Sequence, residues 1–147
     1  MTVVRASDLA HLAALLRRSG GIKSRHNWAT RERRAWAAGF FDGEGYVGNK
    51  AGGDKQHCHY LTAAVTQKTR PLLDRFQDTV GFGKVYGPHR SGAHTPMFAW
   101  TCYGLRPTLE LLRVLGPWLG PVKYEQFVAA IAYYLRQSAK SRQWRVA

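Results

Sequence analysis

A row of small residues spaced four apart constrains the fold of this chain more than any other feature. Ala35, Gly39 and Gly43 recur at four-residue steps, so on a helix they lie along one face. Without bulky side chains, such a face lets a second helix backbone approach closely. The sequence therefore predicts a helix with Thr30 as its N-cap that runs to about Gly43 and packs tightly against another helix.

Two carboxylates, Asp42 and Glu44, lie at the end of this predicted helix. Acidic side chains at a helix C-terminus oppose the helix dipole, so their presence suggests a use, and metal binding is the obvious one. Hard cations such as Mg²⁺ take carboxylate and phosphate oxygens, and paired metal sites suit phosphodiester hydrolysis. Two copies of the helix meeting across a two-fold axis would place their Glu44 side chains together. The alternative interpretation is an ordinary helix end in which Gly45 terminates the helix and both acids are solvated.

The remaining hydrophobic periodicity predicts an α+β fold with four antiparallel strands, helices on one face of the sheet and the other face open. The expected strands cover 46–50, 58–66, 84–87 and 97–103, and the expected helices cover 7–18, 30–43, 69–80, 107–115 and 122–136. The chain divides into an N-terminal helix with a basic linker (1–29), a main domain (30–138) and a basic tail (139–147).

Strand alternation separates the residues of the sheet into two sets. The apolar set should face the helices and consists of Val47, Leu61, Ala63, Val65, Phe98, Trp100 and Cys102. The opposite set is a mixture of polar, aromatic and small residues, as expected of a surface that reads a DNA groove. It consists of Tyr46, Gly48, Lys50, Tyr60, Thr62, Ala64, Lys84, Tyr86, Met97, Ala99, Thr101 and Tyr103.

The net charge of +13, from 22 basic and 9 acidic residues, predicts an anionic partner. The basic residues are spread along the whole chain, which suits a long polyanion such as nucleic acid better than a membrane surface. No apolar run approaches the length of a membrane span, and the first residues lack the apolar core of a signal peptide. The two cysteines are expected to be buried thiols, which indicates a reducing compartment: the cytoplasm, with nucleoid association, in a prokaryote or phage, or an organelle.

Three segments, in order, resemble the LAGLIDADG homing endonucleases. Residues 37–45 resemble the motif that names the family, with Phe40-Phe41 for the middle aliphatic pair and Gly43-Glu44 for Ala-Asp. Residues 65–69 are similar to the end of the family's second strand, and residues 121–126 to its lysine segment before the last helix. The resemblance covers about residues 30–137 and implies an αββαββα layer with a four-stranded antiparallel saddle-shaped sheet, to which the N-terminal helix is an addition.

The resemblance implies a role for each matching residue. Glu44 would bind the catalytic metal together with Gly43, and Asp42 would be a structural acid at the helix end. Gln67 would order water near the scissile phosphate, and Lys123 would lie near the attacking water or the developing charge. The chain departs from the pattern at Pro71, where some members carry a further basic residue in the active site.

A single copy of the motif implies a homodimer that cleaves both strands of a long, pseudo-palindromic DNA target. The implied cofactor is Mg²⁺, with Mn²⁺ as a substitute, no small-molecule cofactor is expected, and an intron or phage mobile element would carry the gene. The dimer interface is predicted to contain Ala35, Ala38, Gly39, Asp42 and Gly43. The DNA-binding residues are predicted to be Lys50, Tyr60, Thr62, Lys68, Arg70, Lys84, Tyr86, Arg90 and Thr101.

The alternative function is a non-cleaving nucleic-acid-binding protein of the same fold, such as an intron RNA maturase or a DNA-binding regulator. The presence of Glu44, Gln67 and Lys123 together favours the nuclease, because binding alone needs none of them.

Overall fold

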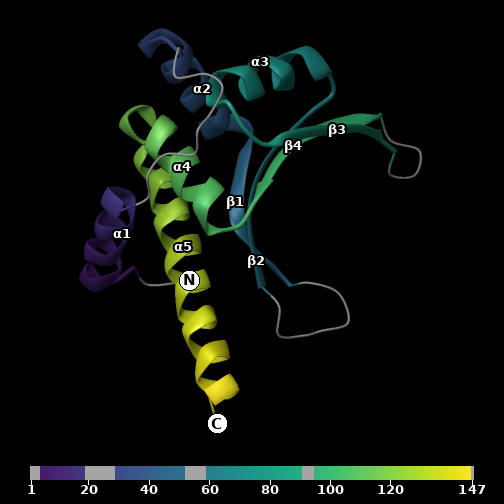
Figure 1. The fold of residues 1–147 in the computed structure, drawn as a ribbon. Helices are drawn as coiled ribbons and strands as arrows, with labels where there is room; N and C mark the ends of the chain where they lie inside the picture. The colour runs from purple at the N-terminus through teal and green to yellow at the C-terminus, as the bar shows by residue number, and fades with distance from the viewer. Residues whose placement is uncertain (1–3, 19–28, 52–58, 91–94, 147) are drawn as a thin grey trace.

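A computed structural model of the chain describes residues 4–18, 29–51, 59–90 and 95–146 (Figure 1). Its helices and strands follow the predicted order, with two α-helices before the first strand pair, one between the strand pairs and two after them. The elements are α1 (Ala6–Arg18), α2 (Arg31–Glu44), β1 (Gly45–Ala51), β2 (His59–Gln67), α3 (Arg70–Val80), β3 (Lys84–His89), β4 (Met97–Tyr103), α4 (Leu105–Leu115), the 3₁₀ helix η1 (Gly116–Trp118) and α5 (Pro121–Val146).

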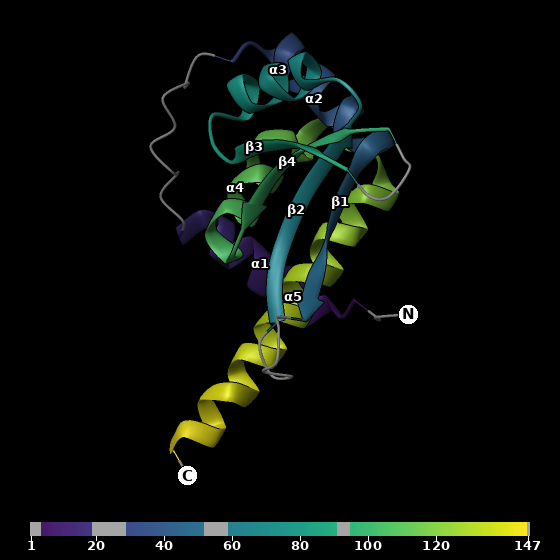
Figure 2. The same ribbon diagram turned by 90° about the vertical axis from the view of Figure 1, so that its right-hand side faces the viewer.

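The four strands form one antiparallel sheet in the order β1-β2-β4-β3. Helices α4 and α5 lie behind the sheet and α2 and α3 lie at one end of it, so one face of the sheet carries no helix (Figure 2). The predicted α+β fold with a four-stranded antiparallel sheet and one open face is therefore confirmed.

The core lies between the sheet and the helices, as strand alternation predicted. Six of the seven residues expected to face the helices are buried, and Phe98 is partly buried against the same core. Its centre is aromatic: the Phe76 ring packs edge-on against Trp100, with 4.9 Å between ring centroids, and Phe41 lies between Phe76 and Phe127. Burial raises the pKa of the Cys102 thiol to about 12, so this cysteine is an inert core residue.

Local capping explains where helices α1 and α2 begin. The Thr30 hydroxyl accepts a hydrogen bond from the Arg33 amide at 3.2 Å, which confirms the predicted N-cap of α2. Helix α1 begins at Ala6, one residue before the predicted start, and the Asp8 carboxylate in its first turn accepts from the Arg5 amide at 2.9 Å. Helix α3 begins at Arg70, one residue after the predicted start; Thr69 makes no side-chain capping hydrogen bond, and Pro71 lies in the first turn.

Helix α5 is longer than predicted and projects past the end of the sheet (Figures 1 and 2). It ends at Val146 rather than at Arg136. The prediction stopped where the apolar periodicity stops, but residues 137–146 contain neither Gly nor Pro and are mostly good helix formers. Helix α4 likewise starts at Leu105, two residues before the predicted Pro107, because proline is tolerated in a first helical turn.

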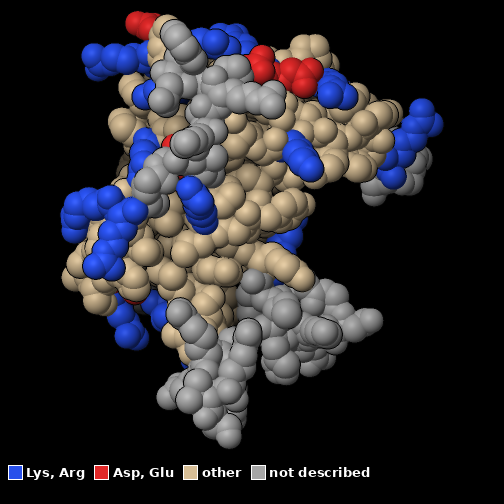
Figure 3. Space-filling view, in the orientation of Figure 1, with Lys and Arg blue, Asp and Glu red and all other residues tan. Residues whose placement is uncertain are grey.

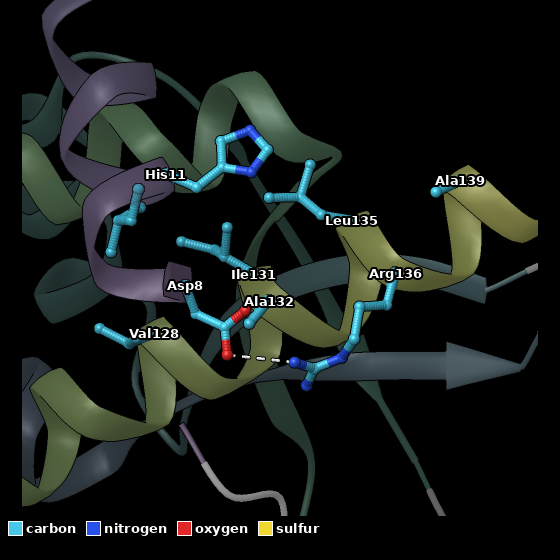
Figure 4. Close-up of a pocket in the computed structure, with 9 residues that line it drawn as sticks. Asp8, His11, Val128, Ile131, Ala132, Leu135, Arg136 and Ala139 are labelled. Carbon is cyan, nitrogen blue, oxygen red and sulfur yellow. Dashed lines mark hydrogen bonds and ion pairs between the residues drawn. The ribbon is translucent and has the colours of Figure 1, made fainter. Parts of the chain in front are cut away.

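Helix α1 packs against α5 (Figure 4). Its Leu12 side chain is 4% exposed, and its Asp8 carboxylate pairs with the Arg136 guanidinium at 3.1 Å. The hydrogen bond from the Arg5 amide, and the Arg136 guanidinium after it, hold the pKa of Asp8 below its usual value. A cavity of about 220 Å³ remains between the two helices, with His11 and Leu135 on its wall. Among the described residues, no helix is long and apolar enough to cross a membrane.

Replacing Trp100 by Ala should destabilise the protein by about 3–5 kcal/mol, because the substitution removes a fully buried ring from the aromatic core. It also leaves the Phe82 carbonyl, which accepts a 3.0 Å hydrogen bond from Trp100 Nε1, without that donor. Urea denaturation measures the change. Tyr103→Ala on the same strand is the control and should cost less than about 1 kcal/mol, because Tyr103 is 59% exposed.

Candidate functional site

The predicted metal ligand Glu44 lies where α2 passes directly into β1. Glu44 is the last residue of the helix and Gly45 the first of the strand, with no loop between them. A Cβ atom at Gly45 would lie 2.5 Å from both the ring and the carbonyl oxygen of Phe41, so only glycine fits at this junction. The Glu44 side chain is exposed and makes no hydrogen bond or ion pair with any described residue.

The start of α5 is joined to the same junction by two hydrogen bonds. The Lys123 ammonium donates to the Gly45 carbonyl at 2.7 Å, and the Asp42 carboxylate accepts from the Gly120 amide at 2.8 Å. Lys123 is thereby held next to the residue that follows Glu44. Asp42 joins two segments of the chain, as expected for a structural acid.

Gln67 completes the predicted catalytic set at this end of the sheet. It is the last residue of β2 and lies two positions beyond Val65, the partner of Gly45 in the strand register. Glu44, Gln67 and Lys123 are far apart in the sequence, yet the fold places all three near the α2–β1 junction.

Arg70 and Arg75, two basic residues close to Pro71 in the sequence, both have partners within the chain. The Arg70 guanidinium pairs with Asp74 at 3.3 Å. The Arg75 guanidinium lies 4.0 Å from the centroid of the Trp36 ring. Neither contact involves Glu44, Gln67 or Lys123.

The small-residue stripe of α2 faces away from the core of this chain. A Cβ atom added at Gly39 or Gly43 would meet no atom of another described residue within 4 Å, and Ala35 is only partly buried. Ala38 is different, because it is 0% exposed and packs in the core beside Ala37 and Phe41. The prediction that Ala38 lies in a dimer interface is therefore wrong: the helical period turns it toward the sheet.

The open face of the sheet has a floor of small residues surrounded by tyrosines. The central rows place Ala64 beside Thr101 and Thr66 beside Ala99. Each strand contributes one exposed tyrosine to this face, and all four are more than 40% exposed. They are Tyr46 on β1, Tyr60 on β2, Tyr86 on β3 and Tyr103 on β4.

Most of the predicted DNA-binding side chains are exposed, but the two threonines are not available as expected. Thr62 is 1% exposed and its hydroxyl donates to the Cys102 carbonyl at 3.3 Å, so the prediction that it reads bases is wrong. The Thr101 hydroxyl is buried and has no hydrogen-bond partner among the described residues. The exposed predicted residues are Lys50, Tyr60, Lys68, Arg70, Lys84, Tyr86 and Arg90.

The prediction of DNA-binding residues omitted Tyr46 and Tyr103, although both were placed on the open face. The signal was present in the sequence as one tyrosine at an open-face position of each strand. In the structure the Tyr46 hydroxyl lies over Gly48, where a Cβ atom would be 2.3 Å away, and the Lys50 ammonium lies 5.7 Å from the Tyr46 ring.

Charge separates the sheet from the helices. The four strands contain no Asp or Glu, whereas α2 and α3 together carry five acidic residues: Glu32, Asp42, Glu44, Asp74 and Asp78. On the face shown in Figure 3, acidic side chains appear mainly at the end where α2 and α3 lie, whereas basic ones are spread over the whole of it, that end included. The strands' lack of acidic residues suits the open face to a polyanion.

Comparison with known proteins supports the fold. No protein-family model matches the chain, and no curated protein sequence matches it. Among solved structures, the homing endonuclease I-CvuI in complex with its target has a TM-score of 0.54 and 22% identity over 65% of this chain and 61% of that chain. The archaeal intron-encoded homing endonuclease I-Vdi141I, complexed with DNA, has a TM-score of 0.55 and 20% identity over 71% of this chain and 69% of that chain.

A third similar structure is described as a LAGLIDADG homing endonuclease. The LAGLIDADG homing endonuclease I-GzeII, in complex with its DNA target, has a TM-score of 0.55 and 22% identity over 71% of this chain, but only 36% of its own chain is matched. The chain spans about three fifths of the length of I-CvuI. The fold of this protein is that of the LAGLIDADG homing endonucleases, and the resemblance seen in its sequence is confirmed at the level of the fold.

Removing the Asp42 carboxylate should destabilise the fold even though the residue lies at the predicted reaction site. Asp42→Ala should cost about 1–3 kcal/mol in urea denaturation, because the Gly120 amide loses a charged acceptor. Asp42→Asn should cost less, since an amide oxygen still accepts. Glu44→Ala is the control and should change stability by no more than about 0.5 kcal/mol, because this carboxylate is exposed. Equal unfolding midpoints for Asp42→Ala and Glu44→Ala would contradict the structural role of Asp42.

Proposed function

We propose that this protein is a divalent-metal-dependent DNA endonuclease of the LAGLIDADG type, which binds duplex DNA as a homodimer and cleaves both strands. The observation that carries the proposal is Glu44. Its side chain is exposed and has no partner among the described residues. Glu44 is the last residue of α2, whose outward face carries the small residues Gly39 and Gly43, and it lies beside the Lys123–Gly45 hydrogen bond. Nothing in the fold of a single chain requires an acid at this position.

Binding of duplex DNA is supported by the open face and by the similar structures. I-CvuI, I-Vdi141I and I-GzeII were each solved in complex with DNA. In this chain the open face has no acidic strand residue and carries exposed Lys50 and Lys84 near its edges. A sheet of this kind can lie along a DNA groove while lysines at its margins contact the phosphates.

A homodimer is supported by the stripe of Ala35, Gly39 and Gly43. The stripe is free of contacts at both glycines, so a second α2 helix can approach its backbone closely. A two-fold axis along this stripe would bring together two copies of the junction that carries Glu44. The interface of the proposed dimer then contains Ala35, Gly39 and Gly43, with Asp42 near its end.

The residues at the α2–β1 junction can hold a hard divalent ion only if two copies of the chain and the DNA phosphates all contribute oxygen ligands. Among the described residues, no three His, Cys, Asp or Glu side chains form a metal site within one chain. Glu44 offers one carboxylate, and the Gly43 carbonyl lies in the last turn of α2, where carbonyls lack helical partners. Two such sets with DNA phosphates would supply the oxygen ligands that Mg²⁺ or Mn²⁺ takes. When bound, the ion supplies charge stabilisation and activation of water.

The chain's own polar groups would assist the reaction at the same place. The Lys123 ammonium, held by the Gly45 carbonyl, adds a positive charge where negative charge develops on the phosphate. Gln67, at the end of β2, can both donate and accept hydrogen bonds and so orient a water molecule. Both residues already lie close to Gly45 in the structure, Lys123 through its hydrogen bond and Gln67 through the register of β1 and β2.

The Glu44→Gln variant tests the enzymatic part of the proposal. The substitution keeps the size of the side chain but removes the negative charge that a hard cation needs. Cleavage of a supercoiled plasmid that carries the DNA flanking the gene should fall by several orders of magnitude in Mg²⁺. Binding of the same DNA in metal-free buffer, measured by gel shift, should be retained or become tighter, because a carboxylate near the phosphates is lost.

Asp78→Asn is the matched control, since it removes an exposed carboxylate from α3 and should leave cleavage unchanged. Cleavage by Glu44→Gln at the wild-type rate would show that the catalytic assignment is wrong. A wild-type protein that binds the flanking DNA tightly but never cuts it in Mg²⁺ or Mn²⁺ would instead be a non-cleaving regulator or maturase.

Gly39→Leu tests the dimer. The added side chain meets no atom of its own chain within 4 Å of the Cβ position, and leucine is a better helix former than glycine, so the single chain should stay folded. Across a close helix interface the same side chain would overpack, at a cost of about 1–3 kcal/mol. The dimer dissociation constant from sedimentation equilibrium should therefore rise roughly 10- to 100-fold. The control is Arg33→Leu, which places a leucine on the same helix away from the stripe; an unchanged constant for Gly39→Leu would place the interface elsewhere.

A further inference from the structure

Two of the open-face tyrosines form a pair at the end of the sheet remote from Glu44. Tyr103 is opposite Thr62 in the register of β2 and β4, and Tyr60 lies two residues along β2 from Thr62. The two tyrosines are therefore diagonal neighbours, whose Cα atoms lie roughly 7–8 Å apart. They are the most exposed of the four tyrosines, at 53% for Tyr60 and 59% for Tyr103.

A positive charge lies beside this pair. Lys50 is the direct partner of Tyr60 across β1 and β2, and its ammonium also lies 5.7 Å from the Tyr46 ring. Lys50 is five residues from Gly45, so its partner Tyr60 lies about 17 Å along the strand from the α2–β1 junction. Tyr103 is level with Gly48, three residues from Gly45, and lies about 10 Å along. The tyrosine pair is thus separate from the proposed cleavage site.

The open face exposes more aromatic ring than the reading of base edges requires. Base edges are read by bidentate contacts from Arg, Lys, Asn and Gln, and by Ser, Thr and apolar side chains. Among the paired strand residues the open face offers Lys50 and Lys84 but no Arg, Asn or Gln, and it carries four exposed tyrosines. Its other residues are Thr, Ala, Gly, Met and His. The Asn49 amide is turned to the other side and donates to the Ala130 carbonyl at 2.8 Å.

Exposed aromatic rings offer a surface for stacking, which the paired bases of a duplex cannot use. In a duplex the faces of the bases are stacked on one another, and only their edges reach a protein. An unpaired base presents its face, and stacking on an aromatic side chain stabilises the complex with any base. Two adjacent exposed rings with a lysine beside them therefore match two successive unpaired nucleotides and their phosphate.

We propose that Tyr60, Tyr103 and Lys50 form a binding platform for unpaired nucleotides of single-stranded DNA or RNA. The two rings stack on successive bases, and Lys50 contacts the phosphate between them. This activity goes beyond duplex cleavage and does not depend on Glu44 or on a metal ion. It gives the protein a means of holding a melted or single-stranded segment at the end of the sheet.

The test is fluorescence anisotropy with labelled oligothymidylate and oligouridylate of about 12 nucleotides, and with a duplex of equal length. Wild-type protein should bind both single strands, and the tighter of the two identifies whether the natural strand is DNA or RNA. Tyr60→Leu and Tyr103→Leu should each weaken this binding on the order of 10-fold, because each removes one stacking surface. Tyr60→Phe and Tyr103→Phe should stay within about 2-fold, because the ring that stacks is kept.

The controls separate the platform from the rest of the surface and from cleavage. Leu72→Ala removes an exposed apolar side chain from α3, outside the sheet, and should leave single-strand binding unchanged. Circular dichroism and urea denaturation confirm that each variant is folded. A wild-type protein that binds the duplex but neither single strand would overturn the platform and leave the proposed nuclease intact. Phe variants as weak as the Leu variants, or an equal loss in Leu72→Ala, would also overturn it.

Discussion

The close contact between Gly45 and Phe41 is the constraint on which the rest of the site depends. The Phe41 ring is fully buried between Phe76 and Phe127, and its carbonyl accepts the Gly45 amide at the end of α2. Since any larger residue at 45 would collide with both groups, the chain can leave the helix and enter β1 without a loop only with glycine there. Packing of the core thereby determines where the preceding residue, Glu44, is presented.

The same packing divides α2 into two faces with different uses. Ala37, Ala38 and Phe41 bury one face against the sheet, and the helical period leaves Gly39 and Gly43 on the other. Glycines on the outer face of α2 do not stabilise a single chain, because a glycine within a helix costs about 1 kcal/mol of folding free energy relative to alanine. The outer glycines therefore support the proposed dimer, in which a second backbone comes close to them.

Much of the fold could be predicted from the sequence, and the errors have identifiable causes. Alternation separated the buried residues, such as Val65 and Trp100, from the open-face residues, because a period of two leaves little ambiguity once strands are recognised. It could not show that Thr62 is buried on the open side, since that burial depends on neighbours in other strands. The assignment of Ala38 to the interface failed because small size alone does not say which side of a helix a residue occupies. The hydrogen bonds of Asp42 and Lys123 join residues almost eighty positions apart, and no local pattern predicts such contacts.

The charge of Glu44 is unfavourable in a single chain. In a chain of net charge +13, an exposed acid near a helix C-terminus is disfavoured by the helix dipole and weakens attraction to any polyanion. Asp42, two residues earlier, offsets the same cost by accepting the Gly120 amide, whereas Glu44 has no such partner among the described residues. In the proposed function, a cation held by Glu44 would reverse the sign of this interaction, because the acid would then help to bind an ion that the phosphates also attract. The asymmetry between the two neighbouring carboxylates, one engaged in the fold and one without a partner among the described residues, supports the proposed division between a structural acid and a metal-binding acid.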